Sequence, residues 1–223
     1  MPSPEPITVL MVAAERREFS GFARKLERLR MLGWGLDYAA EGSHGGARFL
    51  MAANGAGSKL ALLAAERAVV HARPDLLISA GYCGALAPHL RIGDIVACQQ
   101  AEGQPGEILG VDQIVTSAAD KLRAFQQTSA AAVDMESHAL AQFAARNGIP
   151  FRIIRAVSDE AHQDLGLDLN RARDRDGRIR DLSVLHLALL RPWSGLPALI
   201  RLASNASFAS QRLGDFLAST RFD

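Results

Sequence analysis

The residues of this sequence best suited to chemistry are carboxylic acids that directly follow apolar, strand-like runs. A carboxyl group at the end of a buried strand can bind a ligand or transfer a proton. The sequence has three such places: Glu15 and Glu18 after ITVLMVAA, Met135–Glu136 after AAAVD, and Ser158–Asp159 after FRIIRAV.

Two glycine-rich turns follow strand-like runs in the same way, NGAG at 54–57 and GYCGAL at 81–86. Open α/β sheets bind ligands outside the carboxyl ends of their strands, so all these segments are expected to meet at one edge of a sheet. Each has a structural alternative. Glu136 could complement a helix dipole, Asp159 could cap a helix, and the Gly-x-Gly pattern lacks the third glycine of a dinucleotide site. Because all of these segments are expected at the same edge of the sheet, a ligand site is favoured over these separate structural roles.

The elements that must position these residues alternate along the chain. Strands are expected at 7–14, 47–54, 75–80, 93–100, 130–134 and 151–157, with a further strand within 107–117. Helices are expected at 18–29, from 58 to the proline at 74, and at 135–147, where Gly148 and Pro150 end the helix. This alternation predicts one α/β domain over 1–223, with a mixed, mostly parallel twisted sheet flanked by helices.

The last quarter of the chain has a different composition. Residues 164–181 are dense in charge and predict a mobile loop, and 182–220 predict two C-terminal helices split around RPWSGLP. Residues 171–223 hold nine Arg against five Asp, a net charge of +4. The apolar stripe from Leu199 to Phe216 favours core packing over a partner surface.

Composition narrows the class of protein. With 223 residues and 48% hydrophobic content the chain supports one sizeable core, and a net charge of +1 gives no sign of a nucleic-acid partner. Cys83 and Cys98 have no companions at metal-ligand spacing, which argues against a metal site or a disulfide framework and fits a reduced cytoplasm. No run approaches the ~20 apolar residues of a membrane span, and no signal peptide is expected.

The segment VDMESHALAQFAARNGIPFRIIRAVSDEA resembles the superfamily of purine nucleoside phosphorylases and methylthioadenosine/S-adenosylhomocysteine nucleosidases. The hallmarks are a V-x-M-E turn, a helix, and a strand that ends in R-A-x-S-D. SAGYCGALAPHLRIGDIV and AAERRE resemble further family segments, so the matches span residues 7–160. Within the superfamily, LSVLHLALLRPWSGLPALIRLASNA is most similar to the hopanoid-associated phosphorylases, which act on adenosylhopane.

The resemblance implies cleavage of the N-glycosidic bond of an adenine nucleoside without a cofactor. Asp159 would protonate or hydrogen-bond the purine N7, and Glu18 would activate water. Glu136 and Met135 would bind the ribose. The base would contact Tyr82, Cys83, Gly84 and Ser158. The nucleophile, water or inorganic phosphate as a co-substrate, would lie by Gly55, Gly57, Arg16 and Arg17.

Two departures from the family pattern leave the nucleophile and the base contacts open. Phosphorylases are expected to carry an Arg and a Ser in the SAGYCG turn, where this chain has Ser79 and Tyr82, so phosphate would need another cation. The aromatic residue that stacks on the purine in the nucleosidases is missing from IVTSAADK, and Tyr82 could replace it.

Two alternative functions also stay open. One is a nucleosidase for small thio-adenosines, and the other is a non-catalytic nucleoside-binding protein. The resemblance further implies a homo-oligomer. A lipid-linked nucleoside would bring the basic residues 182–220 to a membrane surface.

Overall fold

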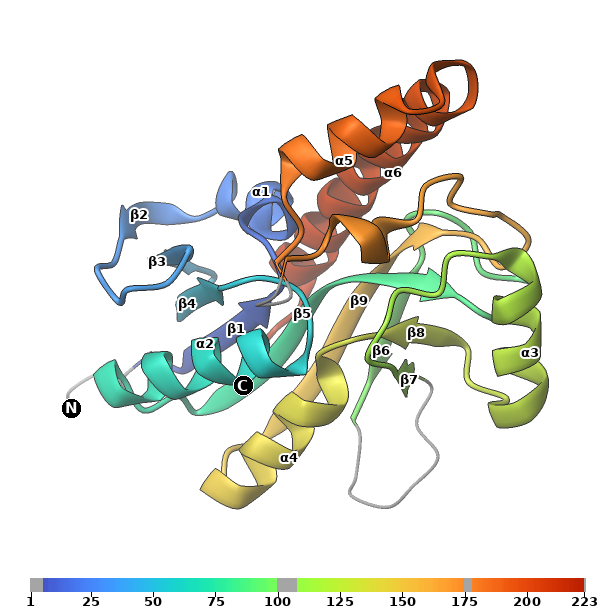
Figure 1. Cartoon of the computed structure of the whole chain (residues 1–223). Coiled ribbons are helices and arrows are strands. Elements are labelled where there is room, and N and C mark those ends of the chain that lie inside the picture. The colour runs from blue at the N-terminus through green and yellow to red at the C-terminus, as the bar shows by residue number, and fades with distance from the viewer. Residues whose placement is uncertain (1–5, 100–107, 175–177, 223) are drawn as a thin grey trace, which may run out of the picture.

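The computed structural model describes residues 6–99, 108–174 and 178–222, and the strands described there form one sheet (Figure 1). The strands are β1 (Thr8–Ala13), β2 (Glu27–Met31), β3 (Tyr38–His44), β4 (Ala47–Ala53), β5 (Leu76–Ala85), β6 (Ile95–Cys98), β7 (Ile108–Gly110), β8 (Ala132–Asp134) and β9 (Phe151–Asp159). The helices are α1 (Ser20–Ala23), α2 (Ser58–His71), α3 (Ala118–Thr128), α4 (Ser137–Asn147), α5 (Asp181–Leu189) and α6 (Pro192–Ser219), with the 3-10 helices η1 (Arg16–Phe19) and η2 (Leu169–Ala172).

Parallel strands in the order β4, β1, β5, β9 form the centre of the sheet. Antiparallel pairs extend it, with β3 and β2 beyond β4 and with β6 beyond β9. The end of the long strand β5 pairs antiparallel with β8 through Gly84 and Val133. Because β8 runs back toward the middle of β5, the residues after β8 lie beside the middle of β5 and next to the turn that follows β4. The expected α/β fold with a mixed, mostly parallel sheet is confirmed.

Alternate side chains of β1 pack into two cores, one on each face of the sheet. Val9 and Met11 pack in a cluster with residues of α1 and α6, and Leu10 and Val12 pack in a cluster with residues of α2 and α4. Figure 1 shows these helix pairs on opposite sides of the sheet. Since both faces of β1 are covered, the strand is apolar throughout rather than alternating. In the described parts of the chain, no helix is both long enough and apolar enough to span a bilayer.

The helix expected at 18–29 is wrong in its second half. The helical segment ends at Ala23, and the edge strand β2 follows it and pairs antiparallel with β3. Phe19 and Phe22 of the short helical segment are buried in the core. Gly21 allows α1 to pack directly on α6, because a Cβ at this position would overlap the carbonyl oxygen of Ser210. α3 forms at residues 118–128, where no helix was predicted.

The two C-terminal helices are separated at residues 190–191 rather than across RPWSGLP. α6 begins at Pro192, and proline is favoured at the first helical position. Gly195 lets the helices approach closely, since a Cβ there would overlap the backbone of Ala188 in α5. The resulting hairpin extends beyond the sheet (Figure 1). Mobility of residues 164–181 stays a prediction; the described part of this segment contains η2 and a bridge between Arg173 and Ile179.

Candidate active site

A cavity of about 610 Å³ lies at the ends of the central strands, beside α5 and α6. One part of its lining is polar and comes from the strand ends and η1; it includes Glu18, Tyr82, Met135, Glu136, Ser158 and Asp159. The other part is apolar and comes from the C-terminal third of the chain; it includes Leu165, Leu182, Leu185, Leu199, Leu202 and Ala206. The cavity lining is therefore amphipathic: most of its titratable groups come from the strand ends and η1, and Asp181 of α5 lies among the apolar residues.

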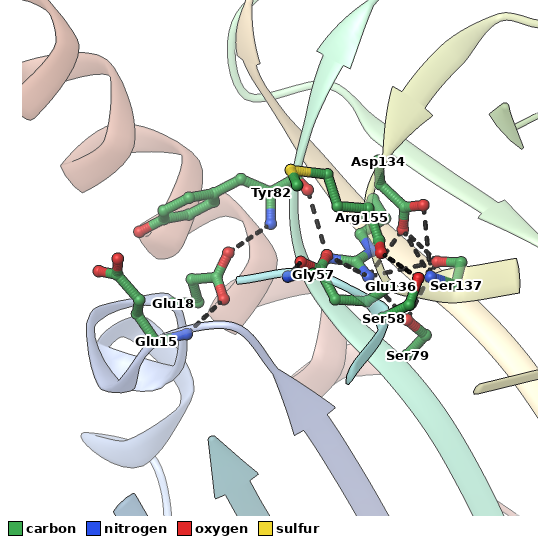
Figure 2. Close-up of polar contacts among 11 residues, drawn as sticks. Glu15, Glu18, Gly57, Ser58, Ser79, Tyr82, Asp134, Glu136, Ser137 and Arg155 are labelled. Carbon is green, nitrogen blue, oxygen red and sulfur yellow. Dashed lines mark hydrogen bonds and ion pairs between the residues drawn. The ribbon is translucent and has the colours of Figure 1, made fainter. Parts of the chain in front are cut away.

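Arg155, in the middle of β9, organises the polar end. Its side chain is wholly buried, and its guanidinium lies 2.7 Å from Asp134 Oδ2 and 3.3 Å from Glu136 Oε2 (Figure 2). The same group donates to the Ser79 hydroxyl at 2.7 Å and to the Ser137 hydroxyl at 3.2 Å. Burial alone would lower the pKa of Arg155, but the surrounding carboxylates outweigh it and raise that pKa above its usual range. A fixed positive charge thus lies beneath the carboxylates of the cavity.

Glu136 occupies the N-cap position of α4, directly after β8. One carboxylate oxygen accepts a hydrogen bond from the backbone N–H of Gly57 at 2.8 Å, and the other faces Arg155. Burial raises the pKa of Glu136, and the charge of Arg155 opposes that rise. Each carboxylate oxygen can accept more than one hydrogen bond. Glu136 is therefore held rigidly and can still accept donors from a ligand.

Glu18 is the second buried acid of the polar end. Its carboxylate accepts hydrogen bonds from the backbone N–H groups of Tyr82 and Glu15, each at 3.0 Å (Figure 2). Burial, opposed by the charge of Arg155, raises the pKa of Glu18 to about 7. A base that titrates near neutral pH combines a useful ionised fraction with a useful proton affinity. Glu18 is thus suited to accept a proton from a bound nucleophile.

Gly81 makes the approach of these groups to β5 sterically possible. Its φ is +138°, and a Cβ there would lie 2.8 Å from both Glu18 Oε1 and Arg155 Nη1. Any side chain would therefore displace the acid or the guanidinium.

Asp159, the last residue of β9, lies against the backbone of Gly84, where a Cβ would come within 3.1 Å of Oδ1. Its Oδ2 accepts a hydrogen bond from the Ser158 hydroxyl at 2.8 Å, and its Oδ1 is ion-paired with Lys121 of α3. The other base-contact candidates line the same wall. Tyr82 donates its hydroxyl to the Arg17 carbonyl oxygen at 3.4 Å, and burial raises the pKa of the Cys83 thiol, which keeps it neutral.

The residues predicted for the nucleophile are arranged differently from the expectation. The Gly55 N–H donates to the Ala14 carbonyl oxygen at 2.8 Å and the Gly57 N–H donates to Glu136, so neither amide is free to bind phosphate. Arg16 lies over the Tyr38 ring, 5.5 Å from its centroid, and does not line the cavity.

Arg17 does line the cavity, but it is ion-paired with Glu15. The backbone donors of the two glycines are thus engaged within the protein, and the nucleophile site expected at these four residues stays a prediction.

The sequence did not lead us to predict three charged residues near the cavity: Asp134, Arg155 and Lys121. Arg155 carried a usable signal, because a charged residue inside the apolar run FRIIRAV requires a buried counter-charge. Asp134 directly precedes the V-x-M-E methionine, and its position at the end of the run AAAVD was the available signal. Lys121 carried no signal, since α3 itself was not predicted. In the described parts of the chain, no group of three or more His, Cys, Asp or Glu side chains is arranged to hold a metal ion.

Solved structures with this fold include nucleoside-cleaving enzymes. The methylthioadenosine/S-adenosylhomocysteine nucleosidase of Helicobacter pylori is 14% identical, with a TM-score of 0.69 over 96% of this chain and 97% of that one. The futalosine hydrolase of the same organism is 16% identical, with a TM-score of 0.66 over 96% and 97%. The nucleosidase of Neisseria meningitidis, in complex with methylthio-immucillin-A, is 20% identical, with a TM-score of 0.63 over 96% and 99%. These likenesses establish the fold.

The family is established by the sequence match. Residues 37–104 and 102–185, which together make up more than half of the chain, match the Phosphorylase superfamily. The match contains the ends of β5, β8 and β9, which supply most of the polar end of the cavity. The chain belongs to the phosphorylase superfamily and is one of its enzymes.

Proposed function

We propose that the protein hydrolyses the N-glycosidic bond of an adenine nucleoside that carries a large apolar 5′-substituent. The observation that carries this proposal is the amphipathic cavity lining, to which the strand ends and η1 contribute most of the acids and α5 and α6 contribute leucine side chains. A nucleoside fits that division, since its ribose and base are polar and its 5′ end points away from the base. The names of the structural relatives, nucleosidases and a nucleoside hydrolase, agree with the reaction class.

The polar end supplies a role for each acid. Glu136 accepts hydrogen bonds from the ribose hydroxyls, and its charge favours the cationic sugar that develops as the bond to N9 breaks. Glu18 takes a proton from water, whose oxygen attacks C1′. The electron pair of the broken bond passes to the purine, and Asp159 gives a proton to N7. Adenine leaves as a neutral base, and the sugar keeps its 5′-substituent.

Two observations favour water over phosphate as the nucleophile. A base with a pKa of about 7 suits the activation of water, and the donors expected to hold phosphate are used within the protein. The product distinguishes the two reactions: hydrolysis gives a free sugar in buffer with or without phosphate. Release of a sugar 1-phosphate, with adenine release dependent on phosphate, would refute the hydrolytic assignment.

The apolar end supports a bulky hydrocarbon substituent, and adenosylhopane is the substrate that the resemblance suggests. The side chain of Ala206 in α6 lines this end of the cavity. Ala206→Phe should raise KM for an adenosine with a long apolar 5′-substituent about tenfold and leave KM for methylthioadenosine unchanged, because only the larger substrate needs that volume.

Ser207→Phe is the matched control, since the next residue of the same helix is exposed and does not line the cavity. Equal effects of Ala206→Phe on both substrates, or a strong preference of the unmodified enzyme for methylthioadenosine, would favour the small-substrate nucleosidase. Binding of both nucleosides without adenine release would identify a non-catalytic binding protein.

A lipid-linked substrate also implies contact with a membrane surface, and the α5–α6 hairpin has suitable chemistry. Leu182 is 81% exposed, Trp193 is 95% exposed and Ile200 is 70% exposed. From 182 to 214 the sequence contains three Arg and no acidic residue. Apolar side chains can enter the interface while basic ones attract anionic headgroups at about 1 kcal/mol each. We therefore propose peripheral binding of this hairpin to anionic membranes.

Sedimentation with phosphatidylserine vesicles at low salt tests this contact. Trp193→Ser should lower the bound fraction several-fold, and Val70→Ser, at an 80% exposed residue of α2, should leave it unchanged. Failure of the unmodified protein to bind would refute the membrane contact. The cytoplasmic location and the homo-oligomer also stay proposals, and sedimentation velocity without vesicles measures the latter.

A further inference from the structure

Lys121 is a buried charged residue next to the cavity, paired with Asp159 of the cavity lining, and the proposed reaction assigns it no role. It lies in the first turns of α3, and its side chain is wholly buried. Burial of a lysine is costly unless its charge is paired and its donors are used. The position of its ammonium group is therefore informative about function.

The three N–H donors of the Lys121 ammonium group have three acceptors. One is Asp159 Oδ1, and the others are the backbone carbonyl oxygens of Glu160 at 2.9 Å and Gln163 at 3.2 Å. Lys121 thus fixes both the carboxylate that ends β9 and the turn that follows it. The opposite oxygen, Asp159 Oδ2, contacts the Ser158 hydroxyl instead, so the two oxygens have different environments.

The two buried cations, Arg155 and Lys121, pair with different acids. Arg155 faces Asp134 and Glu136, whereas Lys121 pairs with Asp159. Asp159 therefore has its own counter-charge, separate from the charge that stabilises the ribose-binding acid. A dedicated cation is useful where a carboxylate changes its charge during the reaction, because the charge that forms is then compensated without movement of other groups.

We propose that Lys121 is a positioning residue for Asp159, and this inference rests on the proposed function. Lys121 holds Oδ1, so the proton for N7 resides on Oδ2. When the C1′–N9 bond breaks, its electron pair passes to the purine and the Oδ2 proton passes to N7. Asp159 becomes a carboxylate, and the Lys121 ammonium, which keeps all its protons, compensates that charge. Lys121 acts on the leaving group only through Asp159.

A double-mutant cycle tests whether Lys121 acts through Asp159. Lys121→Met and Asp159→Asn should each lower kcat for adenine release about 10²-fold or more, the effect expected on loss of general-acid catalysis, with KM changed less than about threefold. Because the two residues act as one unit, Lys121→Met should lower kcat by less than about twofold in the Asp159→Asn background. Lys59→Met, at an exposed lysine of α2, is the matched control and should leave kcat unchanged.

Lys121→Met alone leaves a buried carboxylate unpaired and can fail to fold, but the double variant removes both charges. The comparison of the double variant with Asp159→Asn therefore decides the question by itself. A further large loss of kcat in the double variant would show that Lys121 only anchors the turn at residues 160–163, and it would overturn the proposal.

A second substrate separates the two roles. A 4-nitrophenyl riboside with the same 5-substituent has a leaving group that departs as a stable anion and needs no proton. Folded Lys121→Met should cleave it within about threefold of the unmodified enzyme, because the general acid is not required there. Equal slowing on both substrates would contradict the proposal. Absence of adenine release by the unmodified enzyme would instead refute the proposed function itself.

Discussion

The ionisation of Glu18 links the stability of this protein to its proposed chemistry. In the unfolded chain this carboxyl group ionises near its ordinary pKa of 4.5, but in the folded protein burial raises its pKa to about 7. Between these values the unfolded chain loses the proton and the folded protein keeps it. Ionisation therefore favours unfolding, and the contribution of this group to stability falls as the pH rises from about 4.5 to about 7.

The size of the effect follows from the displacement of the pKa. At about 1.4 kcal/mol per pKa unit, the rise from 4.5 to about 7 amounts to roughly 3.4 kcal/mol. About 2.5 kcal/mol of this falls between pH 5 and pH 8. Glu18→Gln cannot ionise, so its free energy of unfolding relative to the unmodified protein should rise by that amount between the two pH values. The substitution also alters hydrogen bonds with Tyr82 and Glu15, but that cost does not depend on pH.

Urea denaturation of both proteins at pH 5 and pH 8 measures the difference. Glu66→Gln, at an exposed residue of α2, is the matched control. The same variants link stability to activity: kcat/KM of the unmodified enzyme should fall as the pH drops through about 7, and Glu18→Gln should lose about 10²-fold or more in kcat. A stability difference for Glu18→Gln that is equal at both pH values would refute the assignment of Glu18 as a buried base.

Three further substitutions test the framework around this acid. Arg155→Met should lower the free energy of unfolding by about 3–5 kcal/mol, because it leaves buried Asp134 and Glu136 without their cation; unchanged denaturation in urea would contradict this. Gly81→Ala should abolish most activity and destabilise the protein by about 1–3 kcal/mol, because the positive φ of Gly81 strains any other residue. Normal kinetics of this variant would show that the site has room to adjust. Gly21→Ala should lower the free energy of unfolding by about 1–3 kcal/mol, because the added methyl group separates α1 from α6. Thermal denaturation measures this loss, and kinetics of the folded fraction should show no specific effect on kcat.

Much of the sheet and of the site was accessible from local patterns. The strands around Leu10 and Leu77 are buried on both faces, so each reads as a continuous apolar run in any context, and the strand around Ile153 is apolar apart from two arginines. Glu18, Glu136 and Asp159 follow such runs, and the carboxyl ends of strands in an α/β sheet collect at one edge. The prediction that they share a site therefore needed only the order of the elements, and they do line one cavity.

Contacts between distant segments decide features that local patterns do not show. The helical segment expected at 18–29 ends at Ala23, and Gly21 within it packs on Ser210, 189 residues further along the chain. The amides of Gly55 and Gly57, which were expected to lie by the nucleophile, donate to Ala14 and Glu136. Spacing within a segment carries no information on either contact.

The sequence by itself determined which residues are acidic, which runs are buried strands and which family the chain resembles, because those properties depend on residue type and on periods of a few residues. Only the tertiary structure decided the state of the acids. It surrounded Glu18 with enough protein to raise its pKa to about 7, and it brought the buried cations Arg155 and Lys121 to separate carboxylates. Burial and pairing of charge depend on distances between segments far apart in the chain, and the fold alone sets those distances.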